Sequence, residues 1–457
     1  MSTVDMQPAA DAPKRRAERP RLGPNYRKVY LATAFSNVGD GMAGIAYPWL
    51  ASAITRNPLL VAIVAGVQRL PWLFFTLPAG VITDRVDRRK AMVSMDVLRG
   101  AFTVLIAFAV LGEQDVLPGP DELDTVVGTR TGLYLLLLVA TLLLGCAEVL
   151  RDNCNQTFLP SIVAPEHLEQ ANGRIWGIES AANTFVGPPI GSFLLVAAFS
   201  LPFFVDAGTF FAAAALIALI PGTFRASRPE HASGGTWRDD LREGVRWLWA
   251  HPLLRAMAII LGVMNMASML SGSVLILYAQ DVLRVTPLTF TLMGFGFAVG
   301  AIVGSYAAPW LSKRLGSGTC LALTLWSGAL TQVAVGLVSW WPVVAVVFAV
   351  GTMLGSTWNV ITVSLRQTII PSHLLGRVNS VYRFFAWGMM PIGAAIGGFT
   401  VWVVDLSASR EMALRSVWFV SGVIHLGLFL VGRRLLTTER LEAARAAAIG
   451  SAAQPEG

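Results

Sequence analysis

Long apolar runs and short polar connections alternate along nearly the whole chain. A helix needs about 20 consecutive apolar residues to cross the hydrocarbon core of a bilayer, and twelve runs reach roughly that length. We expect a transmembrane helix over each of them: 29–53, 58–82, 91–111, 131–150, 173–199, 201–220, 254–278, 288–311, 319–338, 342–363, 378–404 and 414–432. The pattern therefore predicts an all-α membrane protein with 12 transmembrane helices.

Polar segments divide these helices into two sets of six. The predicted organisation is a tail at 1–28, a first bundle at 29–220, a linker at 221–252, a second bundle at 253–436 and a tail at 437–457. The end of the linker, from Trp237 onward, mixes charged residues with aromatic and aliphatic ones. That pattern predicts a short amphipathic helix at the membrane surface.

The two sets of helices carry related sequences. The letters QTFLPS follow the fourth predicted helix at 156–161, and QTIIPS follows the tenth at 367–372. After each comes a His-Leu pair, then an Asn, and a Gly nineteen residues beyond the Asn. We infer two six-helix pseudo-repeats. Related halves around a site near the bilayer midplane are a transporter architecture.

The positive charges gather on one side of the predicted helices. Of the 35 Lys and Arg residues, 28 lie on the tails, linker, loops and helix ends that share a side with the N-terminus, and five lie on the opposite loops. The other two, Arg69 and Arg99, lie within helices. Cytoplasmic segments carry such an excess. We therefore expect a multi-pass protein of the bacterial inner membrane with both termini in the cytoplasm.

Composition agrees with this interpretation and limits the partners. Only 14% of the residues are charged and 54% are hydrophobic, whereas about a quarter of a soluble domain is charged. A soluble protein is therefore excluded, and the lipid bilayer is an expected partner. The net charge of +7 follows from the cytoplasmic excess of Lys and Arg, so no nucleic-acid partner is expected.

The loop after the second predicted helix holds small, acidic and basic residues in a fixed order: Gly80, Asp84, Arg85, Asp87, Arg88, Arg89 and Lys90. A basic cytoplasmic loop requires the Arg residues but neither Gly80 nor Asp84. The stretch resembles the loop signature of the major facilitator superfamily, although Asp87 stands where that family usually has Gly. This departure resembles the transmembrane secretion effector branch, which contains macrolide and siderophore exporters.

The resemblance implies a role for Asp84. This residue would face the N-terminus of the eleventh helix, which we expect near Asn379. A carboxylate at a helix N-terminus is favourable by about 0.3–1 kcal/mol. Such a contact would latch the two halves together on the cytoplasmic side.

A second resemblance lies in the fifth predicted helix, at Gly187, Pro188 and Gly191. These residues resemble the antiporter motif of proton-coupled exporters in the superfamily, although Ser192 replaces its usual second Gly. Small residues let helices approach closely, and Pro bends a helix. Gly and Pro are also frequent in membrane helices that lack this role.

Charged residues within the predicted helices are functional candidates, because a charge in the bilayer is costly. Asp40 and Arg69 lie at similar expected depths on neighbouring helices, and we expect them to pair and to couple proton and substrate. A static structural ion pair is the alternative. A second set, Asp96, Arg99, Glu148, Arg151 and Asp152, lies near the cytoplasmic ends and is expected to form a gate with Asp84 and Arg85. The alternative is that these ion pairs only fix the helix ends. Glu179 and Asp206 are weaker candidates.

Other patterns narrow the function by exclusion. The sequence lacks a phosphate-binding loop, a catalytic triad order and a channel filter repeat. Its five His and three Cys residues are scattered without metal-ligand spacing. We therefore expect no enzyme, no metal and no cofactor. The expected function is secondary active export of a small molecule (drug, macrolide-like or siderophore-like) by proton antiport. The energy source would be the proton gradient, and the protein would work as a monomer. A lipid or lysolipid flippase and a non-transporting membrane scaffold are the alternatives.

Overall fold

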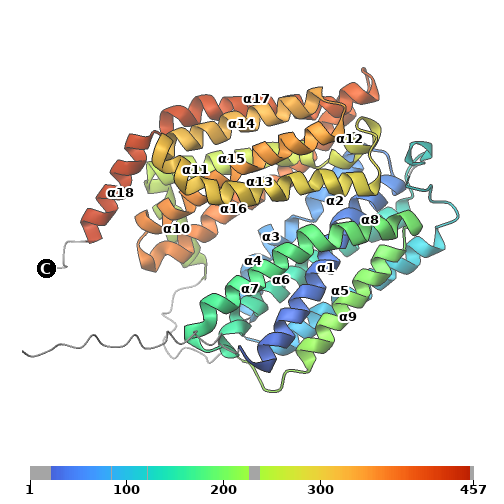
Figure 1. Cartoon of the computed structure of the whole chain (residues 1–457), viewed down its shortest axis with the longest axis horizontal. Coiled ribbons are helices and arrows are strands. Elements are labelled where there is room, and N and C mark those ends of the chain that lie inside the picture. Colours follow the sequence, from blue (N-terminus) through green and yellow to red (C-terminus); the bar gives the residue numbers. More distant parts are fainter. Residues whose placement is uncertain (1–21, 84, 121, 226–236, 453–457) are drawn as a thin grey trace, which may run out of the picture.

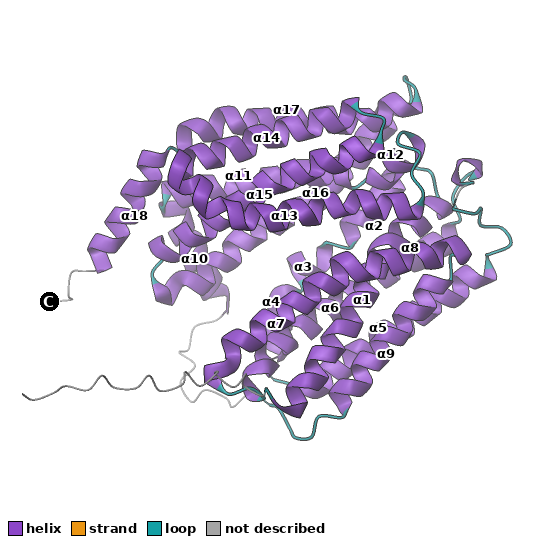
Figure 2. Ribbon diagram, in the orientation of Figure 1, coloured by secondary structure: helices purple, strands orange, loops and turns teal. Residues whose placement is uncertain are grey.

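The computed structural model describes residues 22–83, 85–120, 122–225 and 237–452. Within these ranges the chain folds into helices joined by short connections, with no strand (Figure 2). Two predicted tail segments are helical: residues 23–28 belong to the first helix, and a helix covers most of 437–457. Residues 226–236 of the predicted linker lie outside the described ranges.

Thirteen elements make up the N-terminal half. They are α1 (Gly23–Ile54), α2 (Pro58–Val67), α3 (Leu70–Phe74), α4 (Thr76–Thr83), α5 (Arg88–Gly112), η1 (Leu123–Thr125), α6 (Thr131–Phe158), η2 (Leu159–Ser161), η3 (Pro165–His167), α7 (Leu168–Ser180), η4 (Ala181–Val186), α8 (Gly187–Ala197) and α9 (Leu201–Ala218). The fifth predicted helix is one continuous rod built from α7, the π-helical η4 and α8.

Nine helices make up the rest of the described chain. They are α10 (Trp237–Ala250), α11 (Pro252–Gly272), α12 (Leu275–Asp281), α13 (Pro287–Leu315), α14 (Ser317–Leu337), α15 (Trp341–Ile369), α16 (Ser372–Asp405), α17 (Arg410–Leu435) and α18 (Thr438–Ala452). The eleventh predicted helix therefore begins at Ser372 rather than near Asn379, because Pro371 stops the preceding segment and Ser372 directly starts the next helix.

Among the described residues, ten helical segments are long and apolar enough to cross a membrane. They correspond to predicted helices three to twelve. The first predicted helix corresponds to α1, which is long enough but carries polar residues such as Asn37 and Asp40. The second is divided into α2, α3 and α4. Pro71 has no N–H to donate to the carbonyl of Val67, so the helix breaks at this point. The fold is an all-helical multi-pass membrane fold.

The two halves meet at one end of the molecule and separate at the other (Figure 1). We call the end that holds α12 the outer end and the end that holds α10 and α18 the inner end, following the predicted orientation. One hydrophobic cluster at the outer end contains residues of both halves, including Trp49, Phe203, Tyr278 and Trp418. At the inner end each half has its own cluster, around Phe158 in the first and Trp358 in the second. The two halves thus share one hydrophobic core at the outer end and have separate hydrophobic cores at the inner end.

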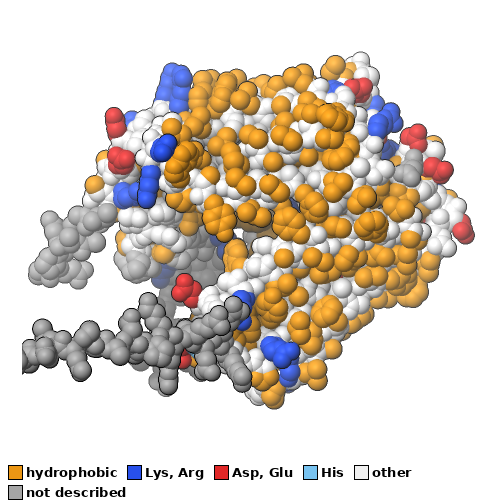
Figure 3. All heavy atoms as spheres, viewed as in Figure 1, with side chains coloured by type: hydrophobic (Ala, Val, Ile, Leu, Met, Phe, Trp, Pro, Cys, Tyr) orange, Lys and Arg blue, Asp and Glu red, His pale blue; other side chains and the backbone are white. Residues whose placement is uncertain are grey.

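The surface follows the same plan. Figure 3 shows hydrophobic side chains over the middle of both halves on the viewed face, with charged side chains toward the ends and a hollow between the halves on the inner side. An apolar belt of this kind is what a bilayer covers.

Close glycine contacts recur in the two halves. A Cβ on Gly187 would lie 2.5 Å from the carbonyl oxygen of Val38 on α1, so α8 and α1 touch backbone to backbone. In the second half, a Cβ on Gly393 of α16 would lie 2.1 Å from the carbonyl oxygen of Met266 on α11. The eleventh helix therefore packs on the seventh as the fifth packs on the first, which agrees with the repeat seen in the sequence.

The amphipathic helix α10 packs against the inner end of α16. A Cβ on Gly244 would lie 2.9 Å from the carbonyl oxygen of Arg377, Trp249 packs on Phe385, and Leu248 is fully buried. Arg377 also forms an ion pair with Glu243. The linker helix is therefore a fixed part of the second half.

Candidate functional site

A cavity of about 330 Å³ lies inside the N-terminal half. Five parts of the chain line it with mainly polar groups: α1, the α2–α3 junction, α5, α6 and α9, joined by Asn183 of η4. Its charged lining residues are Asp40, Arg69, Arg99, Glu148 and Asp206. The structure thus brings together Asp40, Arg69, Arg99 and Glu148 from the predicted site, and adds Asp206, which the sequence gave little reason to favour.

Asp40 forms its ion pair with Arg99, not with Arg69. Arg99 also donates a hydrogen bond to Ser36 Oγ at 3.2 Å, and its guanidinium lies 4.0 Å from the ring centroid of Phe210. The predicted Asp40–Arg69 pair is therefore wrong. The second predicted helix is interrupted at Gln68 and Arg69, so the side-chain positions expected for a straight helix do not apply there. Arg99 reaches the depth of Asp40, being about 16 Å along α5 from Arg88.

Arg69 nevertheless lines the same cavity as the Asp40–Arg99 pair. It has no ion pair with any described residue, its Nε is buried without a hydrogen bond, and Glu148 is the acidic residue whose charge acts on it. A Cβ on Gly145 would lie 2.7 Å from the ring of Pro71, so α3 packs tightly against α6 beside Glu148. Arg69 is therefore a cavity cation without a fixed partner.

Asp206 on α9 is a buried carboxyl beside the ion pair. Its side chain abuts the backbone of Gly39: a Cβ there would lie 2.2 Å from Asp206 Oδ1. Its hydrogen bond is a long one, 3.5 Å from Thr209 Oγ1, and no cation pairs with it among the described residues. A carboxyl that is 2% exposed and lacks a cation is costly to bury as an anion.

A second buried ion pair lies below the cavity. Arg151 Nε on α6 contacts Asp96 Oδ1 on α5 at 3.1 Å, with side chains 2% and 0% exposed, and Arg151 Nη1 lies 3.8 Å from Asp152. Asp96 and Arg99 therefore do not pair with each other along α5, but reach out to two different helices. Each of these contacts stays within the N-terminal half.

The loop signature holds helix ends within the same half. Arg88 donates to the carbonyl oxygen of Thr157 at 3.0 Å, and Arg89 donates to that of Ile220, so both cations lie at the C-terminal ends of helices. Arg85 is exposed, and Gly80 has open space where a Cβ would lie. Asp84, the predicted latch, lies outside the described residues.

Asp87, expected only as a departure from the family pattern, joins two parts of the chain in this loop. Its Oδ1 accepts a hydrogen bond from the N–H of Lys90 at 3.1 Å and caps α5, while Oδ2 accepts from the N–H of Phe224 at 3.1 Å. Burial alone raises the pKa of Asp87, but the two backbone N–H groups and the charges of Arg89 and Lys90 outweigh burial and lower it. An Asp directly before a helical run is a capping signal that could have been found.

The antiporter-like residues Gly187, Pro188 and Gly191 lie where α8 crosses α1. A Cβ on Gly191 would lie 2.9 Å from the Cα of Met42, and the ring of Pro188 lies close to Gly41. Ser192, where the motif departs from its usual form, hydrogen-bonds to Thr291 Oγ1 at 2.6 Å and to the carbonyl oxygen of Pro287 at 3.0 Å. The motif thus joins the first helix to α13 of the other half.

At the outer end an ion cluster joins the two halves. Asp281 of α12 accepts from Arg56 of the first half and from Arg410 Nε at 3.3 Å. Arg410 Nη2 also donates to the carbonyl oxygen of Arg56 at 2.8 Å, and Gln280 Nε2 donates to Ser52 Oγ at 2.9 Å. Arg56 and Arg410 are two of the five Arg residues that the sequence places on the outer loops.

The second half holds a cavity of different chemistry, about 250 Å³ in volume. Its lining is neutral, with polar groups from Ser271, Thr324, Gln332 and His425. From 253 to 404 the sequence contains a single acidic residue, Asp281. The membrane-depth carboxyls therefore belong to the N-terminal half alone. Among the described residues, no group of three or more His, Cys, Asp or Glu side chains is arranged to hold a metal ion.

The chain is similar in sequence to known efflux proteins. The profile of the transmembrane secretion effector family matches residues 20–426. The multidrug efflux pump Tap of Mycobacterium tuberculosis is 26% identical over 374 residues, which cover 81% of this chain and 85% of the pump. The enterobactin exporter EntS of Shigella boydii is 26% identical over 384 residues, which cover 82% of this chain and 85% of the exporter.

Solved structures show the same fold. A bacterial homologue of the iron transporter ferroportin, in its inward-facing state, aligns with a TM-score of 0.65 at 17% identity over 90% of this chain and 98% of that one. The nucleoside transporter NupG aligns with a TM-score of 0.63 at 10% identity over 90% and 99%. By its sequence profile and its fold, the chain belongs to the transmembrane secretion effector family of major facilitator superfamily transporters, and the two curated relatives above are efflux proteins.

Proposed function

We propose that this transporter exports a small molecule across the bacterial inner membrane in exchange for protons, by alternating access. Export is supported by the similarity to an efflux pump and a siderophore exporter. The positive-inside distribution supports cytoplasmic termini. The sequence has no phosphate-binding loop that would indicate ATP hydrolysis, so the proton gradient is the proposed energy source. The protein works as a monomer, without a cofactor.

The Asp40–Arg99 ion pair is the observation that carries proton coupling. It lines the cavity of the N-terminal half together with two further carboxyls, Glu148 and Asp206, and one further cation, Arg69. Three carboxyls face two guanidiniums, so at least one acid has no counter-charge when all are ionised. We propose that one of the three carboxyls holds a proton at little cost in free energy. The carboxyl that is protonated then determines which of the others Arg99 binds.

A coupling step follows from this arrangement. When Asp40 is ionised, it holds Arg99 and so ties α5 to α1. When a proton neutralises Asp40, the ion pair is lost and Arg99 turns to Asp206, one helical turn from the Phe210 ring on which its guanidinium already lies. The contact between α1 and α5 then loosens. Binding of substrate in the cavity favours release of the proton, because both compete for the same groups.

The contacts between the halves support the alternating part of the proposal. The outer end is held by the Arg56–Asp281–Arg410 cluster and by Ser192 with Thr291, whereas the inner end has separate cores. This arrangement admits substrate from the cytoplasm. Export then requires these outer contacts to break while the inner ends close.

Proton-driven accumulation in proteoliposomes tests the proposal. One pH unit corresponds to 1.36 kcal/mol for each proton, so one-for-one exchange of a neutral substrate gives about a tenfold substrate gradient for each unit of pH difference. The probe is a dye that the wild-type protein is first shown to export from cells. Accumulation should vanish when nigericin collapses the pH gradient. Accumulation that persists with nigericin would contradict proton antiport.

A further inference from the structure

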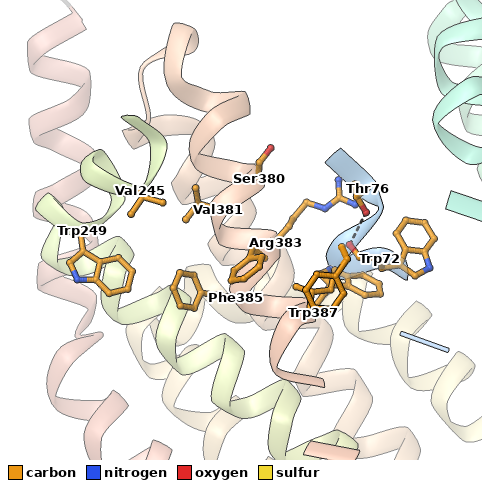
Figure 4. Close-up of a pocket in the computed structure, with 12 residues that line it drawn as sticks. Trp72, Thr76, Val245, Trp249, Ser380, Val381, Arg383, Phe385 and Trp387 are labelled. Carbon is orange, nitrogen blue, oxygen red and sulfur yellow. Dashed lines mark hydrogen bonds between the residues drawn. The ribbon is translucent and has the colours of Figure 1, made fainter. Parts of the chain in front are cut away.

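A larger cavity lies outside the site described above, between the halves on the inner side. It measures about 540 Å³ and is walled by α3 and α4 of the first half, by α16 of the second and by the linker helix α10 (Figure 4). It shares no lining residue with the two cavities inside the halves. A role in proton coupling therefore does not account for it.

Half of its twelve lining residues are aromatic: Trp72, Phe74, Trp249, Phe384, Phe385 and Trp387. Trp72 and Trp387 come from different halves and stack with ring centroids 5.9 Å apart, so the two halves are in contact at the cavity wall. Phe74 and Phe384 are 68% and 54% exposed, so aromatic faces extend beyond the cavity to the surface of the molecule. Such walls bind an apolar chain or ring.

Arg383 gives this apolar cavity one charged group. Among the described lining residues it alone is charged, and it has no ion pair or hydrogen bond with any residue that the structure describes. Figure 4 shows its side chain reaching from α16 toward Thr76 in the opposite half. Arg383 is an exposed residue, so its guanidinium is open to a ligand at the mouth of an apolar cavity, and phosphate and carboxylate are its best-fitting partners.

The position of Arg383 along α16 gives the depth of that anion. The 21 residues from 384 to 404 carry no charge and end at Asp405. At 1.5 Å per residue they extend about 31 Å, which matches the hydrocarbon thickness of about 30 Å. Arg383 therefore lies at the inner boundary of the apolar core, which is the level of lipid phosphates.

We propose that this cavity binds an anionic phospholipid of the inner leaflet. Arg383 holds the phosphate, and one acyl chain lies along Phe384 toward the Trp72–Trp387 stack. The lipid enters sideways, past the exposed Phe74. The linker helix α10 forms one wall, and α3 and α16 come from opposite halves. The bound lipid therefore contacts the linker helix and both halves while their inner ends are apart.

Native mass spectrometry of the whole chain in dodecyl maltoside tests this proposal. The probes are dioctanoyl phosphatidylglycerol, dioctanoylglycerol, which lacks the phosphate, and dodecanoate, a free anionic amphiphile. The variants are Arg383→Gln, Arg383→Lys as the charge-preserving change, and Arg440→Gln as the same charge loss on the exposed face of α18. Thermal unfolding confirms that each variant is folded.

The wild-type protein should bind the phosphatidylglycerol more tightly than dioctanoylglycerol. A hydrogen-bonded charge is expected to make at least about a tenfold difference in apparent Kd, so Arg383→Gln should lose that preference, while Arg383→Lys and Arg440→Gln should retain it. Equal binding by Arg383→Gln and wild type would overturn the proposal. So would dodecanoate binding that depends on Arg383 and exceeds phosphatidylglycerol binding, because the cavity would then serve a free solute.

Discussion

The ion cluster at the outer end holds the molecule open toward the inside, and removing its one acid should shift the balance of states. Among the residues that the structure describes, Asp281 alone forms ion pairs with both Arg56 and Arg410. In Asp281→Asn, Arg56 loses its ion pair, whereas Arg410 keeps only its contact with Asp405 at 3.1 Å. The cost applies only while the outer end is closed, because the halves separate in the outer-open state.

The size of the shift follows from the burial of the cluster. The side chains of Arg56, Asp281 and Arg410 are 16%, 21% and 30% exposed. Exposed ion pairs contribute about 0.2–1 kcal/mol, and breaking a fully buried pair costs about 3–5 kcal/mol. A half-buried cluster lies between them, at about 2 kcal/mol. The ratio of inner-open to outer-open molecules should therefore fall about 30-fold.

Distance measurements between two spin labels can follow that ratio. Labels at Val127→Cys and Met412→Cys lie on exposed outer positions of opposite halves, in a chain whose three native cysteines have been replaced. Asp281→Asn should enlarge the population with a long distance. Glu113→Gln is the matched control, since it removes an outer ion pair with Arg130 inside one half. An unchanged distance distribution in Asp281→Asn, or an equal shift in Glu113→Gln, would refute the reasoning.

Two further predictions concern the loop signature and the antiporter-like helix. Asp87→Ala should lower the free energy of unfolding by about 1–2 kcal/mol at pH 7. Because folding lowers the pKa of Asp87, the loss is full above the ordinary value of 3.8 and disappears as pH falls through the folded pKa, which parallel denaturation of both proteins at several pH values would reveal. Gly187→Ala should reduce export severely, since its Cβ would meet the carbonyl oxygen of Val38, whereas Gly132→Ala, with open space, should be neutral in the same dye efflux assay.

The sequence predicted the course of the chain well because hydropathy and helix length depend on the bilayer rather than on tertiary detail. It predicted ten membrane-spanning segments that the structure confirms by length and composition, and a repeat whose glycine contacts recur at Gly187 and Gly393. It did not predict the break at Arg69, although Pro71 is a signal for it.

Side-chain partners were harder to predict, because they depend on how each helix is rotated about its axis. Depth estimated along straight helices paired Asp40 with Arg69 and placed Arg99 near the cytoplasmic end, whereas the structure pairs Asp40 with Arg99. The outer cluster required two loops far apart in sequence to meet at Asp281. The aromatic cavity around Arg383 is formed by four helices, so no local sequence pattern indicated it.

Proton coupling through Asp40 is tested most directly by recording internal pH with trapped pyranine while the exported dye is added to proteoliposomes. The wild-type protein should move protons when dye is added. Asp40→Asn should still let dye move down its own gradient but without proton movement, while Asp115→Asn, the same change in an exposed outer loop, should behave as wild type. Dye-dependent proton movement in Asp40→Asn at the wild-type rate would contradict coupling through the Asp40–Arg99 pair.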